Sequence, residues 1–485
     1  MPIKAIPYAH QVEAFNFVCD KFGLGRDSPI STGTALLMEM GTGKTITTIA
    51  VIGALAEARA INKVLIVAPL SIVGVWQEEF AKFAEFSYEL TVLSGSSSKK
   101  AEKLKQMQGR KLQVAVINYE SAWRLEKELL GWNADIIVAD EGHKIKTHNI
   151  SAAKTMHKLG AKAKYKMLLT GTIITNKAID VFSQYKFINP AVFGNSFYIF
   201  RNRYFDMTGY GNYTPVLKQN MEKELSGKIH SIAFRTTKAQ CLDLPITTDI
   251  VRTVELEPSA MKIYKDLVKD SYAQLVTGTK AGTLVVTATN VLTRLLRLSQ
   301  LTGGFVGDDE GNTPQKISSA KRNALEDIIE TVLNEGKKVV VIARFVAEIK
   351  AIEKMLVKKQ VGYSLIMGGV KDRDLQVLQF QNDPNVQVFI GQIATAGLGI
   401  TLTSASTMVF YSLDYSMSNF EQTKARIHRV GQKENCTYIY LIAKDTVDSK
   451  VLLALQDKAD LAKMLVDDYK NGANPFQVKG SQDGK

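Results

Sequence analysis

The stretch LLMEMGTGKT, residues 36–45, joins an apolar run to a glycine turn and a Lys-Thr pair. Residues 41–43 are typical of a tight turn, and Lys44 and Thr45 would begin the helix after it. Backbone N–H groups at such a helix start bind phosphates; Lys44 would then contact β/γ-phosphates and Thr45 would bind Mg²⁺. Met38 stands where the common phosphate loop has its first glycine. A chance surface turn is the alternative.

An acidic pair follows a second apolar run, IIVADEGH, at residues 136–143. Asp140 and Glu141 would lie at the carboxyl end of a buried strand, on the sheet edge where open α/β sheets bind ligands. Asp140 would complete the Mg²⁺ site, and Glu141 would orient and polarise an attacking water. An acidic loop unrelated to the glycine turn is the alternative. The nearby histidines match no zinc spacing and are interpreted as polar-network or surface residues: His143, His148 and His157.

Short apolar runs alternate with amphipathic helical patterns in two parts of the chain, which predicts an α/β fold with two parallel sheets. The expected strands are residues 63–68, 112–118, 135–139 and 165–170 in the first part, and 337–343, 386–390, 407–412 and 437–443 in the second. The expected helices of the first part include 43–58, 71–84 and 149–159. Residues 190–320 are mostly helical in pattern and show no strand periodicity. The predicted domains are 1–190, a helical region 191–320, a second lobe 321–470 and a disordered tail 471–485.

The charge balance favours a polyanionic partner such as nucleic acid. Lys and Arg number 61 against 48 Asp and Glu, a formal charge of +13. The basic run at 98–111 could follow a phosphate backbone, although ordinary solvated lysines explain it equally well. The aromatic cluster at 197–205 is interpreted as core packing rather than base stacking. Three scattered cysteines and the lack of a long apolar run predict a soluble, intracellular protein.

A third motif lies in the second part of the chain, in the stretch NFEQTKARIHRVGQ at residues 419–432. Its spacing places Gln422, Arg426 and Arg429 on one face of a predicted helix. Two arginines on one face fit charge stabilisation of a phosphoryl transition state from across a cleft. A solvated basic helix face is the alternative.

In combination and in order, these motifs resemble those of the Swi/Snf-type ATPases, DNA translocases of helicase superfamily two. The first motif of that family reads Asp-Glu-Met-Gly-x-Gly-Lys-Thr, which MEMGTGKT matches except at Met38 and Thr42. Ile173 stands where the family usually has proline. Further similar stretches are YAHQ (8–11), APLSIVGVWQEEF (68–80), LTGTIITN (169–176) and TAGLGITLTSAS (395–406). The resemblance covers nearly the whole chain.

The resemblance implies two tandem RecA-like lobes with helical protrusions between them, forming an ATP hydrolase that uses Mg²⁺ and moves on duplex DNA without sequence preference. ATP would close the cleft between the lobes. It implies three sets of site residues: catalytic Lys44, Asp140, Glu141, Arg426 and Arg429; ATP-binding Gln11, Gly41, Thr42, Gly43, Lys44, Thr45 and Gln422; and DNA-binding Ser71, Asn118, Tyr119, Thr395 and Gly397. A strand-separating DNA or RNA helicase is one alternative. A nucleic-acid-binding switch that holds ATP with little turnover is another, and a separate loading partner stays open.

Overall fold

The computed structural model describes residues 1–171, 173–174, 177–208, 214–270, 272–276, 283–287, 291–307, 314–370, 372–396 and 399–462. The chain divides into two compact units, the first built on Met1–Asp243 and the second on Leu244–Asp457. The predicted domain boundaries at 190, 320 and 470 stay predictions, and the predicted tail 471–485 lies outside the described residues.

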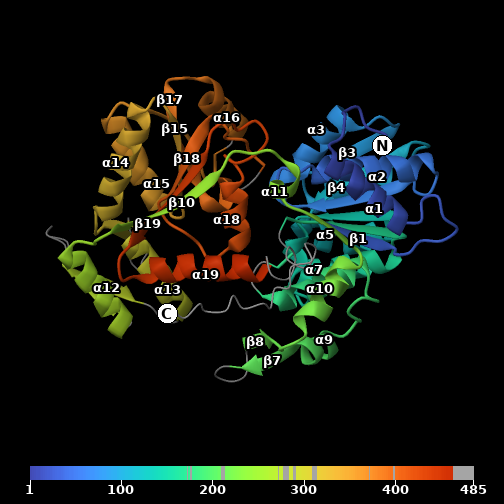
Figure 1. The fold of residues 1–485 in the computed structure, drawn as a ribbon, viewed down its shortest axis with the longest axis horizontal. Helices are drawn as coiled ribbons and strands as arrows, with labels where there is room; N and C mark the ends of the chain where they lie inside the picture. The colour runs from blue at the N-terminus through green and yellow to red at the C-terminus, as the bar shows by residue number, and fades with distance from the viewer. Residues whose placement is uncertain are drawn as a thin grey trace, which may run out of the picture. The chain divides into compact units, whose positions relative to one another are not determined.

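Unit 1 is built on a parallel sheet, in which Figure 1 labels β1, β3 and β4. The described strands of this sheet lie in the order β3-β4-β2-β5-β6-β1-β9. They are β1 (Gly33–Met38), β2 (Lys63–Ala68), β3 (Tyr88–Val92), β4 (Leu112–Asn118), β5 (Ile136–Asp140), β6 (Tyr165–Leu169) and β9 (Ala233–Thr236). Every residue of β1, β4, β5 and β6 is buried, as expected for strands covered by helices on both faces. Because all the strand pairs are parallel, the carboxyl ends of β1 and β5 meet at one edge of the sheet.

Helices cover the two faces of this sheet and form two separate cores. Leu36 packs in a core with α1 (Ala9–Lys21), α2 (Lys44–Glu57) and α3 (Val73–Phe83), whereas the next residue, Leu37, packs on the other face. That second core is covered by α5 (Tyr119–Arg124), α6 (Glu126–Trp132), α7 (Ser151–Lys162), α8 (Val181–Ile188), α9 (Phe197–Tyr204) and α10 (Glu222–His230). The alternation follows from the strand period of two.

Unit 2 repeats the architecture with the strand order β10-β19-β18-β15-β17-β16, again all parallel. The strands are β10 (Thr247–Val254), β15 (Lys338–Ala343), β16 (Gly362–Ile366), β17 (Val386–Gln392), β18 (Ala405–Phe410) and β19 (Cys436–Ala443). The larger helices are α14 (Ala320–Asn334), α15 (Val346–Lys358), α16 (Arg373–Asn382), α18 (Met417–Lys424) and α19 (Val447–Ala462). The predicted α/β class and its two parallel sheets are confirmed.

The region 190–320 contains strands as well as helices, so the prediction that it shows no strand periodicity is wrong. β7 (Phe205–Thr208) and β8 (Thr214–Leu217) form a hairpin, while β9 and β10 join the sheets of units 1 and 2 at their edges. β9 has four residues and β10 is exposed over all but its last residue, so neither carries the apolar run of a buried strand. The buried rings of Phe200, Tyr204 and Phe205 confirm core packing for these members of the aromatic cluster, whereas Tyr198 is 66% exposed.

The other described elements complete the two units. They are α4 (Ser97–Gln106), α11 (Lys238–Cys241), α12 (Pro258–Asp270), α13 (Val291–Thr302), α17 (Ile393–Ala396), β11 (Tyr272–Val276), β12 (Thr283–Thr287), β13 (Phe305–Val306), β14 (Gln315–Lys316) and the 3₁₀ turns η1 (Leu70–Ile72), η2 (Gly142–Ile145) and η3 (Ala178–Asp180). None of the helices in the described ranges has the length and apolarity needed to cross a membrane.

Candidate functional site

The predicted phosphate loop connects the end of β1 to the start of α2. Gly41 and Gly43 have positive φ angles of 84° and 94°, a conformation that glycine adopts without strain. Gly43 is also the N-cap of α2. A Cβ atom on Gly43 would lie 2.1 Å from Nε2 of Gln11, so a larger residue there would have to displace the glutamine side chain. The start of α2 therefore lies where the sequence predicts an anion site, and phosphate binding there stays a prediction.

Two side chains of the N-terminal helix α1 hold this loop. Nε2 of His10 lies 2.7 Å from the carbonyl oxygen of Thr42, and Nε2 of Gln11 donates to the same oxygen at 3.3 Å. Oε1 of Gln11 accepts from the backbone N–H of Tyr8 at 3.0 Å. The assignment of Gln11 to ATP binding stays a prediction. His10 was not predicted, although it directly precedes Gln11 in the same motif.

Lys44 is half-buried and points back over the loop. Its Nζ donates to the carbonyl oxygens of Met38 at 2.9 Å and Glu39 at 3.3 Å. Desolvation lowers the pKa of Lys44, while the carboxylates of Glu141 and Asp140 act in the opposite direction. The ammonium therefore already lies in the field of the acidic pair. Phosphate oxygens could replace the two carbonyls as its acceptors.

Asp140, the last residue of β5, is fixed by hydrogen bonds. Its Oδ2 accepts from Nε1 of Trp76 at 3.0 Å, and its Oδ1 accepts from the backbone N–H of Glu141 at 2.9 Å. Its carbonyl oxygen accepts from the hydroxyl of Tyr119 at 2.7 Å. Burial, followed by the charge of Glu141, raises the pKa of Asp140 to about 7. Two buried carboxylates in this position repel each other, and a bound cation would stabilise their ionised forms.

Glu141 occupies a strained backbone position immediately after the strand. Its φ of 50° is in the left-handed region, where a non-glycine residue needs support from its surroundings. Its Oε2 lies 3.2 Å from Nδ1 of His143, and both side chains are buried. His143 therefore belongs to the polar network of the site, which confirms the interpretation of this histidine.

The residues present fit a bound Mg²⁺. Thr45 at the helix start offers a hydroxyl and Asp140 offers a carboxylate, the hard oxygen ligands that Mg²⁺ prefers. Mg²⁺ usually takes one or two protein ligands together with phosphates and water. No cluster of three or more acidic, histidine or cysteine ligands occurs in the part of the chain that the structure describes.

An ion pair that the sequence analysis missed anchors the start of the loop. Arg235 on β9 is buried, and its Nη2 lies 3.3 Å from Oε1 of Glu39. Its Nη1 also donates to the carbonyl oxygens of Leu37 and Gly171, at 3.1 and 3.3 Å. Glu39 and Arg235 are 196 residues apart, so no local sequence signal connects them. The edge strand thereby ties the loop to the segment after β6.

The predicted DNA contacts of unit 1 lie near the same sheet edge. Nδ2 of Asn118 donates to Oε2 of Glu120 at 2.9 Å, and Asn118 and Tyr119 are both buried. The hydroxyl of Thr395, in unit 2, donates to the carbonyl oxygen of Gln392 at 3.1 Å. Gly397 and the side chain of Ser71 lie outside what the structure describes. All five assignments stay predictions, and those of Asn118 and Tyr119 require exposure of buried side chains.

In unit 2, the helix predicted to carry both arginines is shorter than expected. α18 ends at Lys424, so Gln422 lies in the helix but Arg426 and Arg429 lie in the turn after it. The prediction of a single helix face is therefore wrong. The carbonyl oxygen of Arg426 accepts from the backbone N–H of Leu402 at 3.0 Å, which takes the place of a continued helical bond.

The turn nevertheless keeps the two arginine side chains together, beside the backbone of Gln422. Nε of Arg426 donates to the carbonyl oxygen of Gln422 at 2.9 Å. Nη1 of Arg426 and Nη1 of Arg429 both donate to the carbonyl oxygen of Ile400, at 3.2 and 3.3 Å. Arg426 is 3% exposed, whereas Arg429 is half-buried. The two guanidinium groups therefore meet at one carbonyl, and Arg429 is the more accessible.

Comparison with known proteins places the chain in a family. The SNF2-related domain matches residues 10–302, more than half of the chain, and the helicase conserved C-terminal domain matches residues 320–431. The chain belongs to the SNF2-related family. This confirms the predicted resemblance.

Several relatives of this SNF2-related chain carry names that describe a function. The "DNA repair and recombination protein RDH54" of Saccharomyces cerevisiae is 27% identical over 92% of this chain and 52% of its own length. The "DNA repair and recombination protein RAD54-like" of Drosophila persimilis is 26% identical over 92% of this chain and 62% of its own length. The chain thus spans about half the length of the curated relatives it matches. A solved "SWI2/SNF2 ATPase core in complex with dsDNA" from Sulfolobus solfataricus is 26% identical, covering 96% of this chain and 98% of that chain, with a TM-score of 0.46.

A buried glutamine supports the arginine turn of this SNF2-related chain. Nε2 of Gln432 donates to the carbonyl oxygens of Ala405 at 2.8 Å and Ile427 at 3.1 Å. Its Oε1 accepts from the backbone N–H groups of Lys433 and Glu434, at 2.8 and 2.9 Å. In the sequence, Gln432 is only the last residue of the motif at 419–432. Its role is visible only from its contacts.

Replacing Gln432 with alanine is expected to lower the free energy of unfolding by about 2–3 kcal/mol, because buried backbone groups lose their partners. Denaturant unfolding followed by circular dichroism measures this loss. Lys433→Ala, at the exposed neighbouring position, should stay within about 0.5 kcal/mol of the unchanged protein. Equal stability of the two variants would contradict the structural role of Gln432.

Proposed function

We propose that this SNF2-related chain hydrolyses ATP, with Mg²⁺, and uses the energy to move along duplex DNA. One observation carries the proposal: the phosphate loop with Lys44 and the acidic pair Asp140 and Glu141 lie at one edge of the unit 1 sheet, close enough for both carboxylates to affect the pKa of Lys44. The names of the relatives, which refer to DNA repair and to an ATPase core with duplex DNA, support the choice of substrate and track.

The residues of unit 1 divide the work of hydrolysis among them. The N–H groups at the start of α2 bind phosphate oxygens, and Lys44 exchanges its two carbonyl acceptors for the β/γ-phosphates. Glu141 orients the attacking water and accepts its proton, with His143 holding the carboxylate in place. Mg²⁺ bound by Thr45 and Asp140 would neutralise charge on the phosphates.

Arg426 and Arg429 of unit 2 complete the proposed cycle. In the ATP-bound state the two units close, and these guanidinium groups stabilise the charge that develops on the transferred phosphoryl group. Hydrolysis removes that interaction and lets the units open. Alternating grip on one strand would then move the protein along DNA.

Simple assays distinguish a duplex DNA motor from a strand-separating helicase and from a nucleotide-gated binding switch. A motor on duplex DNA should show ATPase activity that rises with duplex DNA more than with single-stranded DNA or RNA. A strand-separating helicase should also displace an annealed strand. A nucleotide-gated binding switch should bind nucleic acid differently with and without ATP. It should hydrolyse ATP slowly with duplex DNA, with single-stranded DNA, with RNA and with no nucleic acid. A slow rate with duplex DNA would reject the motor.

Binding to DNA should depend steeply on salt and weakly on sequence. The exposed lysines, such as Lys99 and Lys105 on α4, suit phosphates rather than base edges. The logarithm of the association constant should fall linearly with the logarithm of salt, by about 0.9 per neutralised phosphate. Fluorescence anisotropy with two duplexes of equal length and different sequence measures both properties. A strong preference for one sequence at fixed salt would contradict this prediction.

A further inference from the structure

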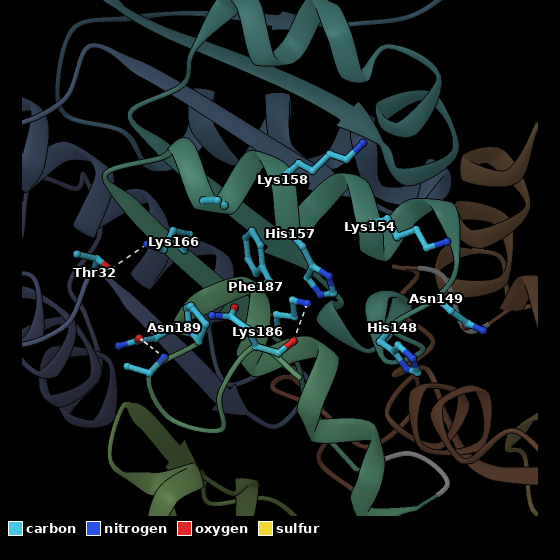
Figure 2. A pocket seen from close by; sticks show the side chains of 15 residues that line it. Thr32, His148, Asn149, Lys154, His157, Lys158, Lys166, Lys186, Phe187 and Asn189 are labelled. Carbon is cyan, nitrogen blue, oxygen red and sulfur yellow. Dashed lines mark hydrogen bonds between the residues drawn. The ribbon is translucent and has the colours of Figure 1, made fainter. Parts of the chain in front are cut away.

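A basic cavity of about 940 Å³ lies in unit 1 between α7, α8 and the amino ends of β1 and β6 (Figure 2). Its titratable lining residues are Lys154, Lys158, Lys166, Lys186, His148 and His157, and no aspartate or glutamate is among the described residues that line it. Lys166 stands near the start of β6, opposite Gly33 at the start of β1. Because the phosphate loop follows the other end of β1, the cavity is at the opposite edge of the sheet and is a separate site.

Two of the lysines have only neutral partners within the described structure. Lys166 is 7% exposed, and its Nζ donates to Oγ1 of Thr32 at 2.8 Å. The Nζ of Lys186 donates to the carbonyl oxygen of Asn195 at 2.9 Å. The buried ammonium of Lys166 therefore lacks the counter-charge that usually offsets desolvation, whereas Lys186 is half-buried. Lys158 differs, because Glu126 pairs with it at 2.5 Å.

The pKa values of His148 and His157 are lowered in part by the same excess of positive charge. The pKa of His157 is lowered to about 4, chiefly by burial. The charges of Lys186 and His148 also lower this pKa, whereas the hydrogen bond to the carbonyl oxygen of Ser183 raises it. Burial also lowers the pKa of His148, with added contributions from Lys186 and Lys154. The cavity therefore holds neutral imidazoles in a positive field. An anion in this space would reverse that field.

We propose that this cavity binds a small or terminal phosphate group, at a site distinct from the ATP site. Lys154, Lys166 and Lys186 would supply the ammonium donors, and the bound anion would provide the counter-charge that Lys166 lacks. The volume lies in the range of small-molecule sites, so several phosphate groups fit. A free polyphosphate compound and the phosphorylated end of a nucleic-acid strand share this chemistry.

Calorimetric titration with inorganic tripolyphosphate tests the site. The titration uses the Lys44→Ala protein, which lacks the lysine of the phosphate loop. Binding should persist there and should weaken about tenfold or more when Lys154→Glu and Lys186→Gln are added. Lys162→Glu, at an exposed lysine on the same helix outside the cavity, should leave the affinity within about threefold. Loss of all binding with Lys44→Ala, or equal weakening by Lys162→Glu, would overturn the proposal.

A measurement on the unchanged protein covers the case in which a variant fails to fold. Selectively ¹⁵N-labelled histidines should show the His148 and His157 signals shifting on titration with tripolyphosphate, with a rise in both pKa values. Unshifted signals would overturn the proposal. If a 5′-phosphorylated oligonucleotide displaces tripolyphosphate and its unphosphorylated form does not, the natural ligand is the phosphorylated end of a strand. If neither oligonucleotide displaces tripolyphosphate, the natural ligand is a free polyphosphate compound. Equal competition by both would indicate backbone binding and would also overturn the proposal.

Discussion

Replacing Arg429 with alanine is expected to lower the rate of DNA-stimulated ATP hydrolysis by about 10³–10⁵-fold, as loss of an arginine finger does. ATP binding should remain, because unit 1 supplies the phosphate loop and Lys44. Arg429 is half-buried, so its loss should disturb the fold less than loss of Arg426, which is 3% exposed. Steady-state ATPase assays with and without duplex DNA, together with a nucleotide-binding titration, measure the two effects separately.

Two control variants sharpen the test of Arg429. Arg429→Lys should rescue little activity, because an ammonium is a point charge without the planar fork of donors. Lys433→Ala removes an exposed positive charge from the same segment and should behave like the unchanged protein. Normal DNA-stimulated turnover in Arg429→Ala would leave this arginine without a part in hydrolysis and would reject the closing two-unit motor.

Lys44→Ala and Glu141→Gln are expected to separate ATP binding from ATP hydrolysis. Lys44→Ala should abolish turnover and weaken ATP binding, because the ammonium contacts the phosphates in both ground and transition states. Glu141→Gln should retain ATP binding and slow hydrolysis by about 10²–10⁴-fold, since only the general base is lost. Single-turnover hydrolysis and an ATP-binding titration give the two quantities.

The matched control for Glu141 is Glu120→Gln, an exposed carboxylate near the same sheet edge. It should hydrolyse ATP at the rate of the unchanged protein. Hydrolysis by Glu141→Gln at that same rate would show that the acidic pair has been assigned wrongly. ATP binding lost in Glu141→Gln but not in Glu120→Gln would instead assign the glutamate to binding.

The buried strands and the loop between β1 and α2 could be read from the sequence. The runs 63–68 and 112–118 coincide with β2 and β4, because a strand covered on both faces is apolar along its whole length. The glycine turn was readable because positive φ angles at Gly41 and Gly43 select for that residue. The acidic pair was readable because it directly follows the apolar run of β5.

The edge strands and the end of α18 could not be read in the same way. β10 pairs with β19 along its whole length, yet its own sequence, TTDIVRTV, mixes polar and apolar residues because it is mostly exposed. The spacing of Gln422 and the two arginines suits a helix. In the structure α18 ends at Lys424, and the backbone N–H of Leu402 donates to the carbonyl oxygen of Arg426. In both cases a partner distant in sequence decides the local conformation.

The sequence by itself therefore determined the α/β class, the phosphate loop and the position of the acidic pair, since each depends on residues that are neighbours in the chain. Only the tertiary structure decided that Arg235 anchors Glu39, that Trp76 orients Asp140, and that both arginines of unit 2 share the carbonyl oxygen of Ile400. These contacts join residues 26 to 196 positions apart. Hydrophobic periodicity carries no information about such pairs, because it reports which face of an element is buried and not which distant group lies against it.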